Sequence, residues 1–485
     1  MAEAPLVRPA LDRNRPGLAS APAHPRRWLA LIVLGALQFI LILDLTVVNV
    51  ALPSMHHELG FTDAGLAWVV NGYVLAAAGL LLLGGRLSDI FGQRRMFLLG
   101  VVSFAAGSLV CGVAVTPEML IVGRVIQGIG EALAAPAALG LIVLLFQDPR
   151  ERMKALGIWG ALSGLGGVSG SVISGVLTEL AHWRFIFWVN LPIAIAALVL
   201  LPLFIRSLRT ARGRQSLNFA GAVLGTFGLA GVVFGVLNAP ASSWVSPLVL
   251  GPLLGGVALL GVMVVVESRS ANPIIPVRFF TNRTRTIAYL AIVVNSGAFF
   301  GYVFLLTLFE QEVLGFTPLQ GGLSYLPLGI GIGGGLAASS ALMPRTGAGP
   351  LVGVGMLGVA TGFLHASILG AESDYLTGIL PGMLLVGLAS GILMPAAVNC
   401  ALHEVDDADA SLGSALHNVM AQLGGALGLA ILVAISLEQA RKLEAMGVDP
   451  EIAITGGYTL AFVVGAASVA VIGAVSLVVL RRRSG

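Results

Sequence analysis

The dominant feature of this 485-residue chain is a series of fourteen apolar stretches, each long enough to cross a lipid bilayer as a helix. A helix needs about 20 apolar residues to cross about 30 Å of hydrocarbon. Barrel strands would be shorter and would alternate apolar with polar residues. The sequence therefore predicts an all-α integral membrane protein with fourteen transmembrane helices, at approximately residues 28–51, 66–85, 96–115, 119–146, 154–177, 183–205, 218–238, 244–266, 286–309, 321–343, 348–369, 376–402, 414–437 and 458–480.

The composition excludes several other classes of protein. Hydrophobic residues make up 57% of the chain and charged residues only 11%, which is too little polar surface for a soluble protein of this length. The 27 basic residues barely exceed the 24 acidic ones and form no stripe with exposed aromatics, so we expect a lipid bilayer as partner and no nucleic acid. Cys111 and Cys400 lie in apolar stretches, and no CxxC pattern or His/Cys cluster predicts a metal site, a disulfide framework or a membrane enzyme.

Basic residues predict the orientation of the chain. With the N-terminus in the cytoplasm, most arginines of the short connections fall on the cytoplasmic side, where positive residues are retained. Both termini are then cytoplasmic, with residues 1–27 as a disordered tail and 481–485 as a basic tail. Arginine greatly outnumbers lysine and Ala, Gly and Val dominate, a composition that fits a bacterial protein. We expect a multi-pass protein of the bacterial cytoplasmic membrane.

Two long basic segments, RSLRTARGRQS and ESRSANPIIPVRFFTNRTR, bracket a pair of helices that have almost no polar residues. This pattern predicts an N-terminal six-helix bundle at 28–205, two inserted helices at 206–285 and a C-terminal six-helix bundle at 286–480. The segment GGRLSDIFGQRR after the second helix has a weaker echo, SSALMPRTGAG, after the tenth helix. Such an internal repeat is typical of transporters.

Charged residues inside the membrane are costly and are functional candidates by default. Asp44 lies about 10 Å below the outer end of the first helix and Arg124 about 8 Å below the outer end of the fourth, so the two side chains can meet. Arg124 would favour the ionised carboxylate and burial the neutral acid, so the proton affinity of Asp44 would change with solvent access. This pair is a candidate proton-coupling site; the alternative is a static ion pair that orients two helices.

The fourth helix carries a polar face. Arg124, Gln127, Gly128 and Glu131 occupy positions i, i+3, i+4 and i+7, which share one side of a helix. Glu131 lies near mid-membrane, where it could attract a cationic substrate, take a second proton, or stay neutral and bond to a neighbouring helix. Further candidates for a substrate cavity, each of which could equally join helices, are Gln38, Asn49, Asn71, Tyr73 and Asn295.

No nucleotide or cofactor site is predicted. The chain has no GxxxxGK[ST] motif, and its lysines are Lys154 and Lys442, so ATP hydrolysis by that route is excluded. A GxGxxG string at 329–334 lies in an apolar span with no strand before it, which excludes a dinucleotide fold. A proton gradient is therefore the expected source of energy.

Glycines of the fifth helix allow close approach of neighbouring backbones, and they include Gly160, Gly164, Gly170 and Gly175.

Together, these motifs resemble the major facilitator superfamily, and specifically its fourteen-helix drug:proton antiporter branch. LDLTVVNVALP at 43–53 is similar to the acidic signature of helix 1, and IVGRVIQGIGEALAAP at 121–136 to the motif of helix 4. WRFIFWVNLPI at 183–193 resembles the opening of helix 6. The resemblance implies that Asp44 is the proton site and that Arg124 takes part in proton transfer.

The segment GGRLSDIFGQRR resembles the cytoplasmic gating motif of the superfamily, with matches at Gly85, Asp89, Gly92, Arg94 and Arg95. The resemblance implies that Asp89 holds an inner gate through charge and helix-dipole contacts. The fifth helix resembles the antiporter motif but departs from it, because Ser171 follows Gly170 where the motif has proline. Glu131 stands where many relatives have a small residue, which bears on the substrate.

The resulting prediction is a proton-coupled antiporter, without cofactors, that exports small amphipathic drugs, antibiotics or secondary metabolites. Its partners would be that small molecule and protons, and it would act as a monomer. One alternative is a proton-coupled transporter of a polar metabolite, which the scarcity of convergent hydrogen-bonding groups disfavours. The other is a membrane sensor or assembly protein that transports nothing, although the sequence shows no sizeable domain outside the membrane.

Overall fold

The computed structural model describes residues 26–205, 219–270, 280–404 and 410–480. All regular secondary structure in these ranges is helical, which confirms the predicted all-α class. A first group of helices comprises α1 (Arg27–Leu59), α2 (Asp63–Phe91), α3 (Gln93–Gly112), α4 (Pro117–Leu145), α5 (Pro149–Leu180), the short α6 (Phe185–Trp188) and α7 (Asn190–Phe204).

The second group follows two intervening helices, α8 (Phe219–Ser242) and α9 (Pro247–Arg269). It comprises α10 (Arg283–Leu308), the π-helix η2 (Phe309–Val313), α11 (Pro318–Ser324), α12 (Leu326–Thr346), α13 (Ala348–Ala366), the π-helix η3 (Tyr375–Ile379), α14 (Leu380–Ala401), α15 (Ala410–Ala445) and α16 (Pro450–Leu480).

Three of the helices have the same type of residue as their N-cap. Thr62, Thr116 and Thr317 each precede a helix, and each hydroxyl accepts a hydrogen bond from a backbone N–H of the first turn. Proline at the first helical position of α4 and α11 lacks the N–H that would otherwise have no partner there. These caps fix where the chain re-enters the helical bundle after each turn.

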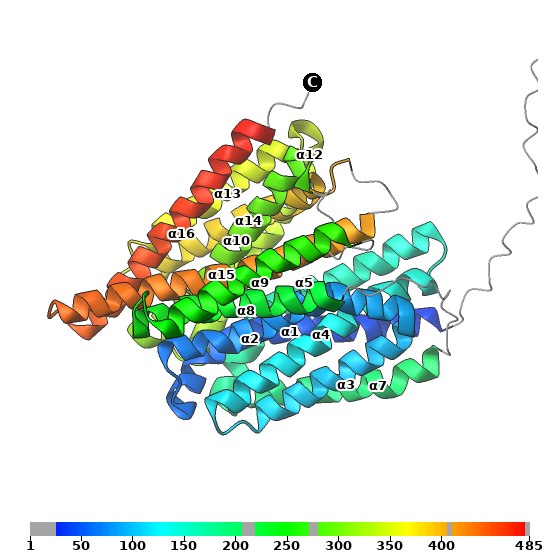
Figure 1. Cartoon of the computed structure of the whole chain (residues 1–485), viewed down its shortest axis with the longest axis horizontal. Coiled ribbons are helices and arrows are strands. Elements are labelled where there is room, and N and C mark those ends of the chain that lie inside the picture. The colour runs from blue at the N-terminus through cyan, green and yellow to red at the C-terminus, as the bar shows by residue number, and fades with distance from the viewer. Residues whose placement is uncertain (1–25, 206–218, 271–279, 405–409, 481–485) are drawn as a thin grey trace, which may run out of the picture.

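The two groups lie side by side, and α8 and α9 run in front of the place where they meet (Figure 1). Within the first group α4 packs on α2 and α3, and α1 packs on α5 and α7; within the second, α10 packs on α15, and α13 on α14 and α16. α8 contacts both α2 and α15, so it touches both groups, whereas most of α9 is exposed. The predicted boundary between residues 205 and 206 borders the segment 206–218, which lies outside the described residues. The predicted boundary between 285 and 286 falls inside α10, three residues after its start. Residues 1–25 of the predicted tail at 1–27, and the predicted tail at 481–485, also lie outside the described residues.

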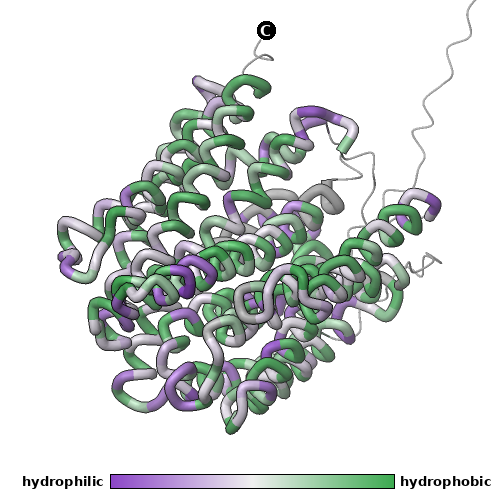
Figure 2. The backbone as a smooth tube through the Cα atoms, turned by 60° about the vertical axis from the view of Figure 1, so that its left-hand side comes forward, coloured by the Kyte–Doolittle hydropathy of each residue, from purple (hydrophilic) through white to green (hydrophobic). Residues whose placement is uncertain are grey.

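Each of the fourteen predicted stretches falls on a helix or on two consecutive helices. Hydrophobic residues cover most of the length of the helices, and hydrophilic residues gather at their ends and turns (Figure 2). Among the described residues, twelve helical spans are long and apolar enough to cross a membrane, while α5 and α8 contribute shorter apolar segments at Leu165–Leu180 and Val223–Ala239. The number fourteen therefore stays a prediction.

Candidate functional site

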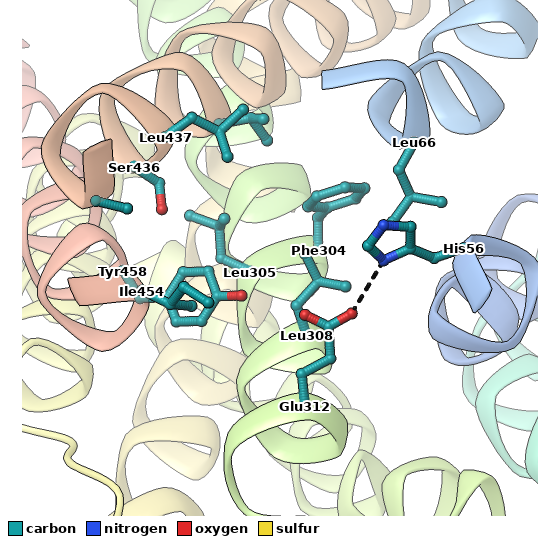
Figure 3. Close-up of a pocket in the computed structure, with 12 residues that line it drawn as sticks. His56, Leu66, Phe304, Leu305, Leu308, Glu312, Ser436, Leu437, Ile454 and Tyr458 are labelled. Carbon is teal, nitrogen blue, oxygen red and sulfur yellow. Dashed lines mark hydrogen bonds and ion pairs between the residues drawn. The ribbon is translucent and has the colours of Figure 1, made fainter. Parts of the chain in front are cut away.

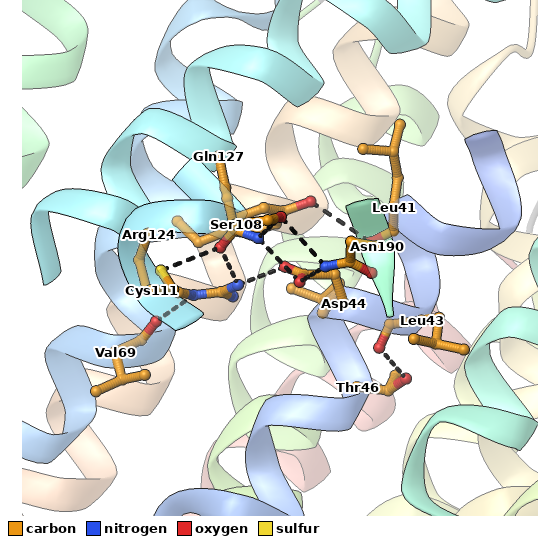
Figure 4. Close-up of polar contacts among 12 residues, drawn as sticks. Leu41, Leu43, Asp44, Thr46, Val69, Ser108, Cys111, Arg124, Gln127 and Asn190 are labelled. Carbon is orange, nitrogen blue, oxygen red and sulfur yellow. Dashed lines mark hydrogen bonds and ion pairs between the residues drawn. The ribbon is translucent and has the colours of Figure 1, made fainter. Parts of the chain in front are cut away.

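Asp44 and Arg124 form an ion pair between the middle of α1 and the N-terminal part of α4 (Figure 4). Neither side chain is exposed to solvent. The structure thus brings together two residues that their depths along the helices allowed to meet. An ion pair without solvent is stable only if further hydrogen bonds satisfy both charged groups, so the surroundings of the pair decide what it can do.

The guanidinium of Arg124 is held from three sides. Its Nε donates to the carbonyl oxygen of Val69 at 2.9 Å, and its Nη1 also donates to Oε1 of Gln127 at 2.8 Å. Its central carbon lies 4.4 Å from the centre of the Tyr73 ring, which adds a cation–π contact. A planar fork of this kind fixes direction as well as charge, which a lysine ammonium cannot do.

Two residues with no role predicted from the sequence complete the cluster around Asp44. The side-chain amide of Asn190, the first residue of α7, donates to Asp44 Oδ1 at 2.7 Å, and Gln127 Nε2 donates to the same oxygen at 3.0 Å. Both amides also donate to the hydroxyl oxygen of Ser108 on α3, at 3.3 and 2.8 Å respectively. Asn190 stands within WRFIFWVNLPI, where a polar residue beside an apolar span was the available clue; nothing in the sequence around Ser108 distinguishes it.

In this arrangement, protonation of Asp44 would change the hydrogen bonds that hold its carboxylate. The ionised carboxylate accepts hydrogen bonds from Arg124, Gln127 and Asn190. A protonated carboxyl group has one O–H donor and less capacity to accept, so these three donors, which belong to α4 and α7, cannot all keep their places when a proton binds. The network can therefore convert proton binding into a change in helix packing.

Glu131 lies two turns along α4 from Arg124 and is 9% exposed. One side of its carboxylate interacts with the hydroxyl of Tyr73, and Oε2 has no hydrogen-bond partner among the described residues. Tyr73 thus contacts Arg124 through its ring and Glu131 through its hydroxyl. The polar face predicted on α4 forms one chain of contacts from Asp44 to a carboxylate oxygen that has no hydrogen-bond partner among the described residues.

Three other predicted cavity residues are buried. Gln38, Asn71 and Asn295 are 7%, 0% and 9% exposed. Gln38 Oε1, both polar atoms of Asn71 and Asn295 Oδ1 have no partner among the described residues. The structure places none of the three in a described hydrogen bond with the Asp44 cluster.

The predicted gating motif forms the turn between α2 and α3. Gly92 ends α2 and precedes α3 with φ +94°, a conformation that residues with a side chain rarely adopt. Gly85 faces Pro136 of α4, Arg94 is partly buried and Arg95 is exposed. The side chain of Asp89 lies outside the described residues, so its role at an inner gate stays a prediction.

The glycines of α5 face two different helices. Gly170 lies against Thr46 of α1, whereas a Cβ atom at Gly175 would lie 2.6 Å from the carbonyl oxygen of Pro318 on α11. The backbone of Ser171 in turn meets Gly322 of α11. Side-chain-free surfaces on α5 thus permit backbone contact between the two groups of helices. The surroundings of Gly160 and Gly164 lie outside the described residues.

Comparison with known proteins identifies the family to which this site belongs. Residues 34–429 match the model described as Major Facilitator Superfamily. The chain belongs to this superfamily. It is 39% identical to puromycin resistance protein pur8 of Streptomyces alboniger, with 93% of each chain covered, and 38% identical to a cephamycin export protein of Amycolatopsis lactamdurans, with 84% of each covered.

A solved structure has a fold similar to that of this major facilitator protein. A bacterial homolog of the human lysosomal transporter Spinster, in an inward-facing and unoccupied conformation, matches with a TM-score of 0.68 at 17% identity, covering 94% of this chain and 97% of the other. The resemblance found in the sequence motifs is confirmed. The chain is a multi-pass membrane transporter of small molecules and not an enzyme. Among the described residues, no group of three or more His, Cys, Asp and Glu could hold a metal ion.

In this major facilitator protein, the two groups of helices meet at the end that holds the C-terminus of α1 and the N-terminus of α11. We call this the outer end. Gln311 Nε2 donates to the carbonyl oxygen of Val50 at 2.8 Å, and Glu179 Oε2 accepts from the backbone N–H of Leu319 at 2.9 Å.

At the same end, His56 Nδ1 lies 3.3 Å from Oε1 of Glu312 (Figure 3). This pair borders a pocket lined by residues of both groups, including Leu66 of α2, Phe304 of α10 and Tyr458 of α16. These hydrogen bonds and the ion pair join α1 and α5 to η2 and α11. The conformation described is therefore held together at its outer end.

Proposed function

We propose that this protein is a proton-coupled antiporter that exports small amphipathic drugs, antibiotics or secondary metabolites across the bacterial cytoplasmic membrane. Two relatives that cover most of the chain are named for puromycin resistance and for cephamycin export. Both names concern organic molecules of antibiotic size. This supports the export of similar molecules. The proposed source of energy is a proton gradient, and no cofactor is proposed.

The buried carboxylate of Asp44 is the observation that carries the proposal. It has no contact with solvent, and donors from α4 and α7 hold it beside the charge of Arg124. Protonation from outside removes the charge of Asp44, loosens the network and releases the drug outward. Deprotonation toward the cytoplasm restores the network and lets the next molecule bind.

Alternating access between the two groups of helices completes the proposed cycle. The contacts at the outer end close one side of the transporter, and the turn at Gly92 belongs to the proposed inner gate, where Asp89 acts. Both termini then lie in the cytoplasm, α8 and α9 lie at the periphery, and the monomer is the working unit. A mostly apolar cavity receives the drug, with Glu131, Asn71, Gln38 and Asn295 as its polar contacts.

The experiment measures proton release caused by drugs in inverted membrane vesicles with a preset pH gradient. We expect release with wild type on adding puromycin, lipophilic cations or neutral antibiotics, and none with Asp44→Asn. Asp449→Asn is the matched control, because Asp449 is exposed and asparagine can replace it as the cap of α16.

Two results would contradict the proposal. Equal proton release from Asp44→Asn and wild type would exclude Asp44 as the coupling site. No release with any compound, together with uptake of a polar metabolite in the opposite direction, would replace the exporter by a metabolite importer.

A further inference from the structure

A second buried carboxylate lies in the other group of helices. Glu310 belongs to the π-helix η2 at the end of α10 and is 0% exposed. Its Oε2 accepts a hydrogen bond from the hydroxyl of Ser324 at 2.8 Å, and its Oε1 has no hydrogen-bond partner among the described residues. In the same ranges no cation pairs with it, which is the opposite of the situation at Asp44.

The groups around Glu310 offer little to an ionised carboxylate. Tyr302, Tyr325 and Tyr375 lie close enough to interact with it electrostatically. However, the hydroxyl of Tyr325 donates to the carbonyl oxygen of Val303 at 2.9 Å, and that of Tyr375 donates to the carbonyl oxygen of Ser324 at 2.9 Å. Ser324 is thus the one described donor to this carboxylate. Burial of a charge without a cation is strongly unfavourable, so the neutral, protonated acid fits this site.

The residues beside Glu310 are the ones that join the two groups of helices. Gln311 donates to α1, and Glu312 pairs with His56 of α1. Ser324 belongs to α11, where Gly322 packs on the backbone of α5. Separation of the groups at the outer end would loosen the elements that bury Glu310 and would admit water to its carboxylate. Its affinity for a proton is then higher in the closed form than in the open form.

We propose that Glu310 is a second proton-binding site of this transporter, and that the proton bound there favours closure of the outer end. This inference extends the proposed function, because a proton taken up from outside would accompany the return of the empty transporter. A single group linked in this way changes the ratio of closed to open protein by up to about tenfold for each pH unit.

Other titratable groups face this region, and their effects must be separated. The elements packed against η2 are α10, α11 and α16, and they carry Tyr302, Tyr325 just after α11, and Tyr458. Tyrosines ionise far above the physiological range. His56 does not, and its protonation would also favour closure by attracting Glu312. All comparisons therefore use a His56→Gln background.

The first experiment detects the proton itself and is independent of transport. Infrared difference spectra of the purified protein between about pH 5 and about pH 9 record the C=O band of protonated carboxyl groups. We expect one component of this band to disappear in Glu310→Gln and to shift in Ser324→Ala, which removes the hydroxyl donor. Glu372→Gln, at an exposed turn, should match the parent. An unchanged band in Glu310→Gln would overturn the proposal.

The second experiment measures closure of the outer end. Spin labels at Leu180 and Met446, two exposed positions near the ends of α5 and α15, report the distance between the groups after Cys111 and Cys400 are replaced by serine. In the parent protein, the population with the longer distance should rise with pH.

Glutamine mimics the protonated acid, so in Glu310→Gln the population should stay closed at every pH. Glu310→Asp keeps a titratable group and should keep a pH dependence. An equal pH dependence in the parent and in Glu310→Gln would overturn the link to closure. Asp44→Asn should lose transport but keep this pH dependence of closure. That result would support the two proposals independently, because one concerns coupling at Asp44 and the other closure of the outer end.

Discussion

Asn190 donates a hydrogen bond of 2.7 Å to the carboxylate of Asp44, although 146 residues separate the two in sequence. This bond joins the start of α7 to the middle of α1. It also completes a set of donors that share the charge of Asp44 with Arg124 and Gln127. The position of α7 is thereby tied to the state of the carboxylate.

Replacing Asn190 by alanine should uncouple drug export from the proton gradient. A hydrogen bond to a charged group contributes about 1.5–3 kcal/mol, so its loss changes the balance between the ionised and neutral carboxyl about tenfold or more. We expect drug-induced proton release to fall by about the same factor. Asn238→Ala is the control, because the amide of Asn238 bonds to Phe234 within its own helix. Wild-type release from Asn190→Ala would show that the bond has no part in coupling.

Arg124→Gln should destabilise the folded protein strongly, by about 3–5 kcal/mol, because it leaves the buried charge of Asp44 without its partner. The double variant Asp44→Asn with Arg124→Gln removes both charges and should recover much of that stability. It should still export nothing. Thermal unfolding in detergent and export from cells measure the two properties separately.

An ion pair kept only for structure would give a different result in the double variant. Export would then return together with stability, because two neutral amides could orient α1 and α4 as the ion pair does. Failure of the double variant to regain stability would instead indicate that Arg124 acts mainly through Val69 and Tyr73.

The sequence predicted those parts of the site that depend on one helix at a time. Hydropathy located the helices, and the depth of Asp44 and Arg124 along them was enough to show that the two could meet. The partners supplied by α3 and α7 could not be predicted, because a hydrophobic helix gives no indication of which of its sides faces α1. Ser108 is one of many serines, and only packing brings it to Gln127.

The inward direction of the Glu310 side chain could not be predicted from the sequence either. It stands in FEQEV, where Gln311 and Glu312 make the segment resemble an exposed helix end. The π-helix turns Glu310 inward, while Gln311 and Glu312 reach toward α1. The direction of these side chains depends on where α10 ends, which periodicity does not determine to within one residue.

Gly175→Ala should weaken the contact between α5 and α11, since the new Cβ would lie 2.6 Å from the carbonyl oxygen of Pro318. We expect the outer end to open more often and export to fall several-fold. Gly333→Ala is the control, because its Cβ would meet no atom within 4 Å. Cross-linking of a Glu179→Cys, Leu319→Cys pair should slow with Gly175→Ala; an unchanged rate would contradict the effect on closure.

Glu131→Gln should separate drugs by charge. The unpartnered Oε2 of Glu131 is buried, where attraction to a cation is little screened, so export of lipophilic cations should fall about tenfold or more. Export of neutral antibiotics should not change, because glutamine keeps the shape of the side chain and its contact with Tyr73. Tyr73→Phe tests that contact alone. An equal loss for both classes, with fewer protons exchanged per drug, would make Glu131 a proton site instead, and no loss for either class would leave it as a link between α2 and α4.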